Sequence, residues 1–187
     1  MKNSTLVIML VSCISSSAFA ATATVEYQDK KGVDGTVNAN TYQLSVKENI
    51  TNNFAGDVSL RSNVKESSGT VSSSRVEVGL TGTTKVGIFN PYLRLATGQK
   101  FTTTKDFSYY SIEPGVTAPI GDTGFTARVG YRLRDAYDST ANADMTKTWR
   151  AGVAYNLTKK DTIGVRYDRE RGDSNYNSWN FNYTRSF

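Results

Sequence analysis

The sequence predicts an all-β protein, a single antiparallel up-and-down transmembrane β-barrel of about ten strands. Apolar and polar residues alternate along most of the chain, which is the period of a strand with one apolar and one polar face. The chain is 38% hydrophobic, yet it holds 11 Tyr, 8 Phe and 2 Trp. This combination is typical of membrane barrels, in which half of each strand is polar. Beyond residue 20, no apolar run approaches the roughly 20 residues that a spanning helix needs.

The alternation is clearest at 41–47, 125–134, 149–157 and 163–168. In 125–134 (FTARVGYRLR), for example, every second residue from Phe125 to Leu133 is apolar, aromatic or small, and the residues that alternate with them include three arginines, Arg128, Arg132 and Arg134. Pro91 interrupts the fifth strand and suggests a bulge. If 81–92 forms a longer turn, or if the first two strands merge, the count becomes eight. The pattern as a whole predicts strands at 22–29, 40–48, 53–63, 73–82, 86–97, 107–119, 124–135, 147–157, 161–170 and 178–187.

The connections alternate in character. Short ones follow the even-numbered strands, at 49–53, 83–85, 121–123 and 158–161. Longer polar loops follow the odd-numbered strands, at 30–39, 64–72, 98–106, 136–146 and 171–177. Short turns on one side and longer loops on the other are the layout of an outer-membrane barrel with both ends in the periplasm.

Residues 1–20 have the features of a secretory signal peptide: a charged start at Lys2, an apolar run over 6–11 and a cleavage site at Ala18-Phe19-Ala20. The mature chain, 21–187, then forms one domain, because no linker or repeat divides it. The segment ending at Cys13 is also similar to a lipoprotein box, so whether Cys13 is lipidated stays open.

Several classes of function are excluded by composition. The chain has no His, and its one cysteine, Cys13, lies in the predicted signal. The mature chain therefore has no Ser-His or Cys-His nucleophile, no zinc site of the Cys/His type and no disulfide framework. We predict that it is not an enzyme and that it has no catalytic, cofactor or metal site. Asp168 and Glu170 could form a carboxylate pair, but we interpret them as partners of Arg166 or Arg150. Basic residues are spread along the strands without a patch, which argues against nucleic-acid binding.

The last strand carries a family resemblance. Trp179, Phe181, Tyr183 and Phe187 alternate with polar residues, and the sequence ends on Phe187. This pattern resembles the C-terminal signature of Gram-negative outer-membrane β-barrels, which is recognised by the barrel assembly machinery. The resemblance implies a porin-like protein in the outer membrane, with lipid and lipopolysaccharide as its surroundings. Arg185 departs from the signature, which usually has an apolar or aromatic residue there.

A soluble secreted barrel that binds a ligand is the alternative, with its faces reversed: apolar inside and polar outside. The basic residues favour the membrane barrel. Most lysines, including Lys30 and Lys100, fall in turns or at strand ends, whereas most arginines fall on the polar faces of strands. Arginine suits bidentate pairing in a confined space.

In the membrane barrel, the polar face lines the lumen. Together with Glu170, the predicted lining has nine basic and six acidic residues. One function that follows is a narrow passive pore for small, preferably anionic solutes, because rings of Arg or Lys select anions. The other is a closed structural or surface-recognition barrel whose paired charges fill the lumen. Small residues such as Gly79, Gly115 and Gly130 would leave some space. The predicted lumen-lining residues are Glu26, Lys47, Asp57, Arg61, Arg75, Glu77, Arg94, Glu113, Arg128, Arg132, Arg134, Arg150, Arg166 and Asp168.

Overall fold

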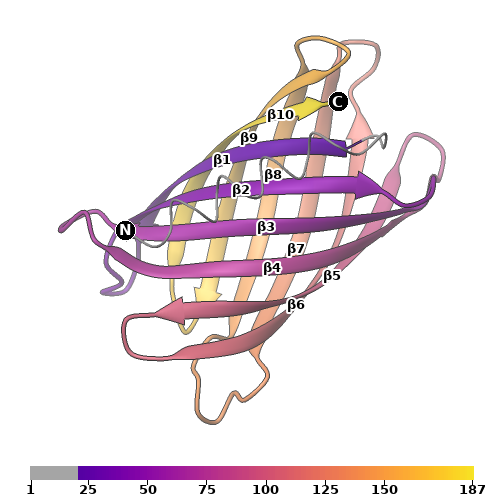
Figure 1. Ribbon diagram of the computed structural model, residues 1–187. Coiled ribbons are helices and arrows are strands. Elements are labelled where there is room, and N and C mark those ends of the chain that lie inside the picture. The colour runs from indigo at the N-terminus through magenta and orange to yellow at the C-terminus, as the bar shows by residue number, and fades with distance from the viewer. Residues whose placement is uncertain (1–20) are drawn as a thin grey trace.

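A computed structural model describes residues 21–187, which form a closed barrel of ten antiparallel strands (Figure 1). Each strand pairs with its neighbours in the sequence. β10 closes the barrel against β1, in a register that runs from Thr22 opposite Ser186 to Gly32 opposite Tyr176. The predicted signal peptide and Cys13 lie outside the described residues. The strands are β1 (Ala21–Gly32), β2 (Ala39–Asn49), β3 (Phe54–Lys65), β4 (Val71–Thr83), β5 (Asn90–Thr102), β6 (Asp106–Pro119), β7 (Phe125–Ala136), β8 (Thr146–Asn156), β9 (Asp161–Gly172) and β10 (Tyr176–Ser186).

The prediction of ten strands is confirmed, and the count of eight is wrong. β5 differs most from its predicted range, because 84–89 forms a turn in which Val86 and Phe89 bond to each other. Pro91 therefore lies at the start of a strand, where the absence of its N–H disturbs the ladder least. The expected bulge at Pro91 is not there; the register shifts instead at Asn63 and Val64, between β3 and β4.

The two ends of the barrel are named here by their connections. The terminal end holds Ala21, Phe187 and the turns 50–53, 84–89, 120–124 and 157–160; the loop end holds 33–38, 66–70, 103–105, 137–145 and 173–175. The prediction that the loop-end connections are longer than the turns at the terminal end is mostly wrong. Only 137–145 is longer than the longest of those turns, 84–89. The strands continue to pair beyond their predicted ends, so that Lys30 and Lys100 lie within β1 and β5.

The two faces of the wall are inverted relative to a soluble barrel. Large apolar side chains are exposed on the outside; Val25, for example, is 58% exposed. Among the described residues, nineteen polar or charged residues are buried but only six hydrophobic ones, four of which are alanines. The soluble alternative, with an apolar interior, is therefore wrong. Residues 21–187 contain no helix long and apolar enough to cross a membrane.

Aromatic side chains pair across neighbouring strands on the outer face. The ring centroids of Tyr131 and Trp149 are 4.8 Å apart, and those of Tyr167 and Trp179 are 5.2 Å apart. Phe125 and Tyr155 form such a pair near the terminal end, at 4.6 Å. Such pairs stabilise a sheet through contacts between directly opposed side chains. The residues of the predicted assembly signal, Trp179, Phe181, Tyr183 and Phe187, are all exposed.

Candidate functional site in the barrel lumen

A polar cavity of about 640 Å³ lies inside the barrel, and all ten strands contribute to its lining. Inward-facing positions recur every second residue, so each strand places two or more side chains in the lumen. Twelve of the fourteen predicted lumen residues line this cavity. The other two, Arg134 and Asp168, are each 2% exposed and form ion pairs inside the barrel with Asp144 and Arg166.

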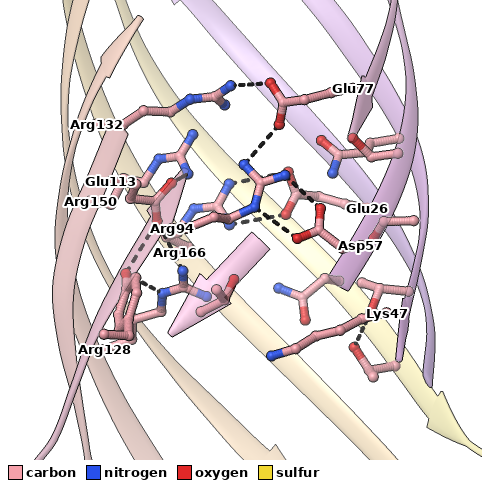
Figure 2. A pocket seen from close by; sticks show the side chains of 18 of the residues that line it. Glu26, Lys47, Asp57, Glu77, Arg94, Glu113, Arg128, Arg132, Arg150 and Arg166 are labelled. Atoms are coloured by element: carbon pink, nitrogen blue, oxygen red, sulfur yellow. Dashed lines mark hydrogen bonds and ion pairs between the residues drawn. The ribbon is translucent and has the colours of Figure 1, made fainter. Parts of the chain in front are cut away.

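One chain of ion pairs crosses the cavity from β3 to β7 (Figure 2). Arg94 donates from Nε and Nη2 to Asp57, at 3.0 and 2.5 Å, and its Nη1 lies 2.8 Å from Glu77. The other oxygen of Glu77 accepts from Arg132 at 2.5 Å and from the Tyr109 hydroxyl at 3.0 Å. Residues from five strands are thus joined through two carboxylates.

A second chain of ion pairs joins β6, β7 and β8 to β9 and β1, and the contact of Arg150 with Asp168 at 3.8 Å links its two halves. Glu113, 1% exposed, accepts from Arg150 at 2.5 Å, from Arg128 at 2.9 Å and from the Tyr92 hydroxyl at 3.1 Å. Arg166 continues the chain, with Asp168 at 2.7 Å and both oxygens of Glu26 at 3.1 Å. Each of the three carboxylates in this chain contacts two arginines, because Glu26 also lies 3.9 Å from Arg61 and Asp168 also lies 3.8 Å from Arg150. Such sharing is expected where basic side chains outnumber acidic ones.

A third cluster lies toward the loop end and was not predicted. Asp144, from loop 137–145, turns into the barrel and is 3% exposed. Its oxygens lie 2.9 Å from Arg134, 2.5 Å from Lys100 and 3.7 Å from Arg75. Burial raises the pKa of the Asp144 carboxyl, but the three bases lower it further than burial raises it, so the pKa lies below its usual range.

Lys30 and Glu170 form a related contact at the loop end, at 3.4 Å. The Ser174 hydroxyl, from loop 173–175, donates to the same carboxylate at 2.9 Å. The prediction that Lys30 and Lys100 lie in turns or at strand ends is therefore corrected: both are inward-facing strand residues. The alternation could have revealed them, because Lys30 continues the series of Glu26 and Gln28. Asp144 lies in a loop, where no such signal exists.

The inward-facing charges are more numerous than predicted. Lys30, Lys100 and Asp144 add two bases and one acid to the nine and six expected. The interior of the described barrel therefore holds eleven basic and seven acidic residues, an excess of four positive charges.

The lumen is filled at the loop end and hollow toward the terminal end. Inward-facing residues near the loop end, such as Thr41, Tyr109, Arg134, Thr146 and Asn180, are at most 2% exposed. Toward the terminal end, the lining is partly exposed and consists mostly of neutral polar residues around Lys47 and Arg128. These neutral residues are Thr22, Thr24, Ser45, Thr81, Thr83, Asn90, Thr117, Asn182 and Thr184.

The inward-facing glycines do not leave an open path. A Cβ at Gly115 or Gly130 would lie 2.3 or 2.6 Å from Tyr92, and one at Gly79 would lie 2.5 Å from Arg94. The space beside these glycines is therefore occupied by side chains that reach across from β5. The expectation that small residues widen the lumen is wrong at these three positions.

Two basic side chains differ from the rest. The Arg128 side chain is 42% exposed, whereas the other arginines of the cavity have side chains that are at most 14% exposed. Lys47 is also exposed, and it has no ion-pair partner among the described residues. Figure 2 shows both at the same level, on opposite walls of the cavity. The hollow part of the lumen thus carries accessible positive charge.

The lumen carboxylates of the described chain lie beside basic side chains. Within residues 21–187, no three His, Cys, Asp or Glu side chains come together as ligands. Asp168 lies 2.7 Å from Arg166, and Glu170 lies 3.4 Å from Lys30. Both carboxylates of the pair considered above are therefore held by basic partners.

Neither a protein-family model nor a curated protein sequence matches the chain. Solved structures, however, match the chain. An outer membrane channel (COG4313) from Pseudomonas putida F1 has a TM-score of 0.56 at 11% identity, over 91% of this chain and 96% of that one. The KdgM porin, in complex with disordered oligogalacturonate, has a TM-score of 0.53 at 14% identity, over 89% and 99%. The β domain of the Bordetella autotransporter BrkA has a TM-score of 0.52 at 12% identity, over 91% and 100%.

These neighbours define the class of fold. They are named as an outer membrane channel, a porin and the β domain of an autotransporter, and the chain shares their fold over nearly its full described length. At 11–14% identity, the likeness establishes the fold alone, and one fold supports different functions. The function has to be argued from the lumen.

Proposed function

We propose that the protein is an outer-membrane channel, narrow and passive, which favours small anionic solutes. The observation that carries the proposal is the charge of the interior: eleven bases against seven acids, with Lys47 and Arg128 accessible in the hollow half. An anion in this cavity is attracted by the excess charge, whereas a cation is repelled.

The exterior supports the membrane placement. A band of exposed valine, leucine and aromatic residues surrounds the barrel, with aromatic pairs toward both ends. Such a surface is unfavourable in water and is suited to the hydrocarbon core of a bilayer with its interfacial aromatic girdles. In this orientation, the terminal end faces the periplasm and the loop end faces the exterior. The outer face of β10 carries Trp179, Phe181, Tyr183 and Phe187, which in this proposal form the signal that the assembly machinery recognises.

One structural neighbour supports an anionic solute class. KdgM was solved with oligogalacturonate, an acidic oligosaccharide. The hollow half here, with its threonine and asparagine hydroxyl and amide groups around two bases, has the donors that carboxylates and sugar hydroxyls use. A small acidic sugar suits this lining better than a neutral or cationic solute.

A closed barrel is the second candidate, and the filled loop end favours it. In that case, the ion pairs around Glu77, Glu113 and Asp144 hold the wall together without conducting. In the channel, the same cluster is the constriction, and passage requires loop 137–145 or the side chains that it contacts to move.

Liposome swelling distinguishes the two candidates. Residues 21–187 would be refolded into vesicles, with the gel shift between unheated and boiled samples as a check on folding. The channel predicts faster swelling in a small acidic sugar than in a cationic solute of matched size. A folded protein that gives no swelling in either solute would support the closed barrel, and equal rates would contradict the anion preference.

A further inference from the structure

Three basic residues face outward at the loop end of the barrel, where the lumen does not use them. Lys147 lies on β8, and Arg169 and Arg171 lie on β9. Lys147 is directly opposite Arg171 in the β8–β9 ladder, and Arg169 is the next outward-facing residue along β9. These three residues are called the basic patch below. They belong to the outer face because they share parity with the exposed Trp149 and Val165.

The outer face is not basic elsewhere at this height. β2 to β5 present Asn40, Ser62, Ser74 and Gln99 there, and β6 and β7 present Asp106 and Asp135. On β1, Lys31 is basic, but it lies 3.1 Å from Asp29 and 3.4 Å from Glu66, which neutralise it. Lys65 and Lys105 are single exposed bases at this end, whereas three bases lie next to one another on β8 and β9.

The basic patch has no acidic partner. None of its three residues forms an ion pair within the described part of the chain, although most basic residues in the lumen do. Arg171 is held in place by uncharged acceptors: its guanidinium donates to the carbonyls of Glu170 and Tyr176 at 2.7 and 2.9 Å and to Asn177 at 3.0 Å. These bonds use three of its five N–H groups, so two donors stay available on a fixed frame.

Aromatic residues fix the depth of the basic patch. Trp149, 60% exposed, lies directly opposite Arg169, and Trp179, 52% exposed, lies on the neighbouring strand β10. Exposed tryptophans mark the interface between the hydrocarbon core and the headgroups. The basic patch lies at this level or just beyond it toward the loop end, which is the depth of headgroup phosphates. Arginine pairs with phosphate in a bidentate manner, and basic clusters at this depth bind anionic headgroups.

We infer that the basic patch binds the phosphates of a phosphorylated lipid, such as lipid A, in the leaflet at the loop end. The inference rests on the membrane placement proposed above. It assigns the lipid to one sector of the barrel, β8 and β9, with the headgroup phosphate at Lys147, Arg169 and Arg171 and the acyl chains against Trp149 and Trp179. The charge complements the ligand, and the neighbouring sectors are neutral or acidic.

Thermal unfolding in defined vesicles tests the inference. The probe is lipid A added to phosphatidylcholine vesicles that hold refolded 21–187, and the readout is the change in the midpoint of the folded gel band. Lipid A should raise the midpoint of the wild type but not that of Lys147→Gln/Arg169→Gln. The matched control, Lys160→Gln/Arg185→Gln, removes two bases from the terminal end and should keep the rise. Dephosphorylated lipid A and inorganic phosphate should raise neither midpoint.

Three results would overturn the inference. The first is that lipid A raises the unfolding midpoint of Lys147→Gln/Arg169→Gln as much as that of the wild type. The second is that dephosphorylated lipid A raises the wild-type midpoint as much as lipid A does. The third is that inorganic phosphate raises the midpoint of the wild type but not that of Lys147→Gln/Arg169→Gln. The last would show an anion site that does not depend on lipid. A protein that forms no folded band in vesicles would instead contradict the membrane placement, so the two failures are distinguishable.

Discussion

Lys47 and Arg128 face each other across the hollow half of the lumen, from β2 and β7 (Figure 2). Arg128 contacts Glu113 at 2.9 Å, but its side chain is still 42% exposed, and Lys47 has no acidic partner in the described chain. These two side chains therefore present the accessible positive charge of the hollow half.

Removing this pair of charges should weaken anion preference. In Lys47→Gln/Arg128→Gln, the reversal potential in a salt gradient should move toward zero, because two accessible positive charges are lost while Glu113 keeps Arg150 as its partner. Arg185→Gln, an exposed basic residue on the outer face, is the matched control and should leave the reversal potential unchanged. If the double variant keeps the wild-type reversal potential, either other residues determine the anion preference or the protein has no anion preference.

Asp144 should hold loop 137–145 over the lumen. Asp144→Asn removes the charge that Arg134, Lys100 and Arg75 share, so these bases repel one another without compensation. We expect larger or more frequent conductance steps and faster proteolysis within 137–145. Asp138→Asn, in the same loop but outside this cluster, is the control. If Asp144→Asn conducts and resists protease as the wild type does, the loop is not held by this carboxylate.

The low pKa of Asp144 predicts how conductance depends on pH. The pKa of Asp144 in the folded protein lies below its usual range. Its carboxylate therefore stabilises the folded protein at every pH above the pKa of an unfolded Asp, about 3.9. This stability is lost as the pH falls through the lower pKa of the folded protein. Conductance of the wild type should therefore stay low from neutral pH to about pH 4 and rise only in more acidic solution. Asp144→Asn should lack this transition. A wild-type transition near neutral pH would show that another group controls the loop.

Glu113 should be the most costly acid to neutralise. Glu113→Gln leaves Arg150 and Arg128 without their shared carboxylate in a confined site, and breaking a buried pair costs about 3–5 kcal/mol. Urea unfolding in lipid would measure the loss. Glu66→Gln, in an exposed pair with Lys31, should cost no more than about 1 kcal/mol. Adding Arg150→Gln to Glu113→Gln should recover part of the stability; if it does not, the ion pair is not the cause.

The outer face can be tested by a charge placed among apolar neighbours. Val153 on β8 lies opposite Val165 and Ala127 and is 46% exposed. Val153→Lys should lower the free energy of unfolding in lipid by about 2–4 kcal/mol, the cost of a lysine near the bilayer midplane. Ser45→Lys, in the hollow half of the lumen, should cost much less. Equal costs would mean that the two faces are wrongly assigned.

The fold was predictable because its signal is periodic. A barrel wall repeats one rule, polar inward and apolar outward, so short segments such as 125–134 and 149–157 determine both the strands and their faces. The errors lie where the rule stops. β5 begins at Asn90, since 84–89 forms its own turn, and at the loop end the strands continue through polar residues for which the sequence predicts loops.

The lumen was predictable in composition but not in its openness. Alternation alone indicates that Arg94 and Glu77 face inward. It does not indicate that Tyr92 and Arg94 occupy the space beside Gly115, Gly130 and Gly79, because this depends on how far side chains reach across strands. Asp144 reaches its partners from a loop, where sequence has no period to follow. Whether the loop end is filled distinguishes a channel from a closed barrel, and it depends on the three-dimensional arrangement of side chains.

The most direct test is a planar-bilayer recording of refolded 21–187 with a salt gradient across the membrane. We predict discrete, small conductance steps with a reversal potential of the sign given by anion preference. A correctly folded barrel, verified by its gel shift, that stays silent across the voltage range would contradict the channel, and discrete steps with cation preference would contradict the role of the eleven inward-facing bases.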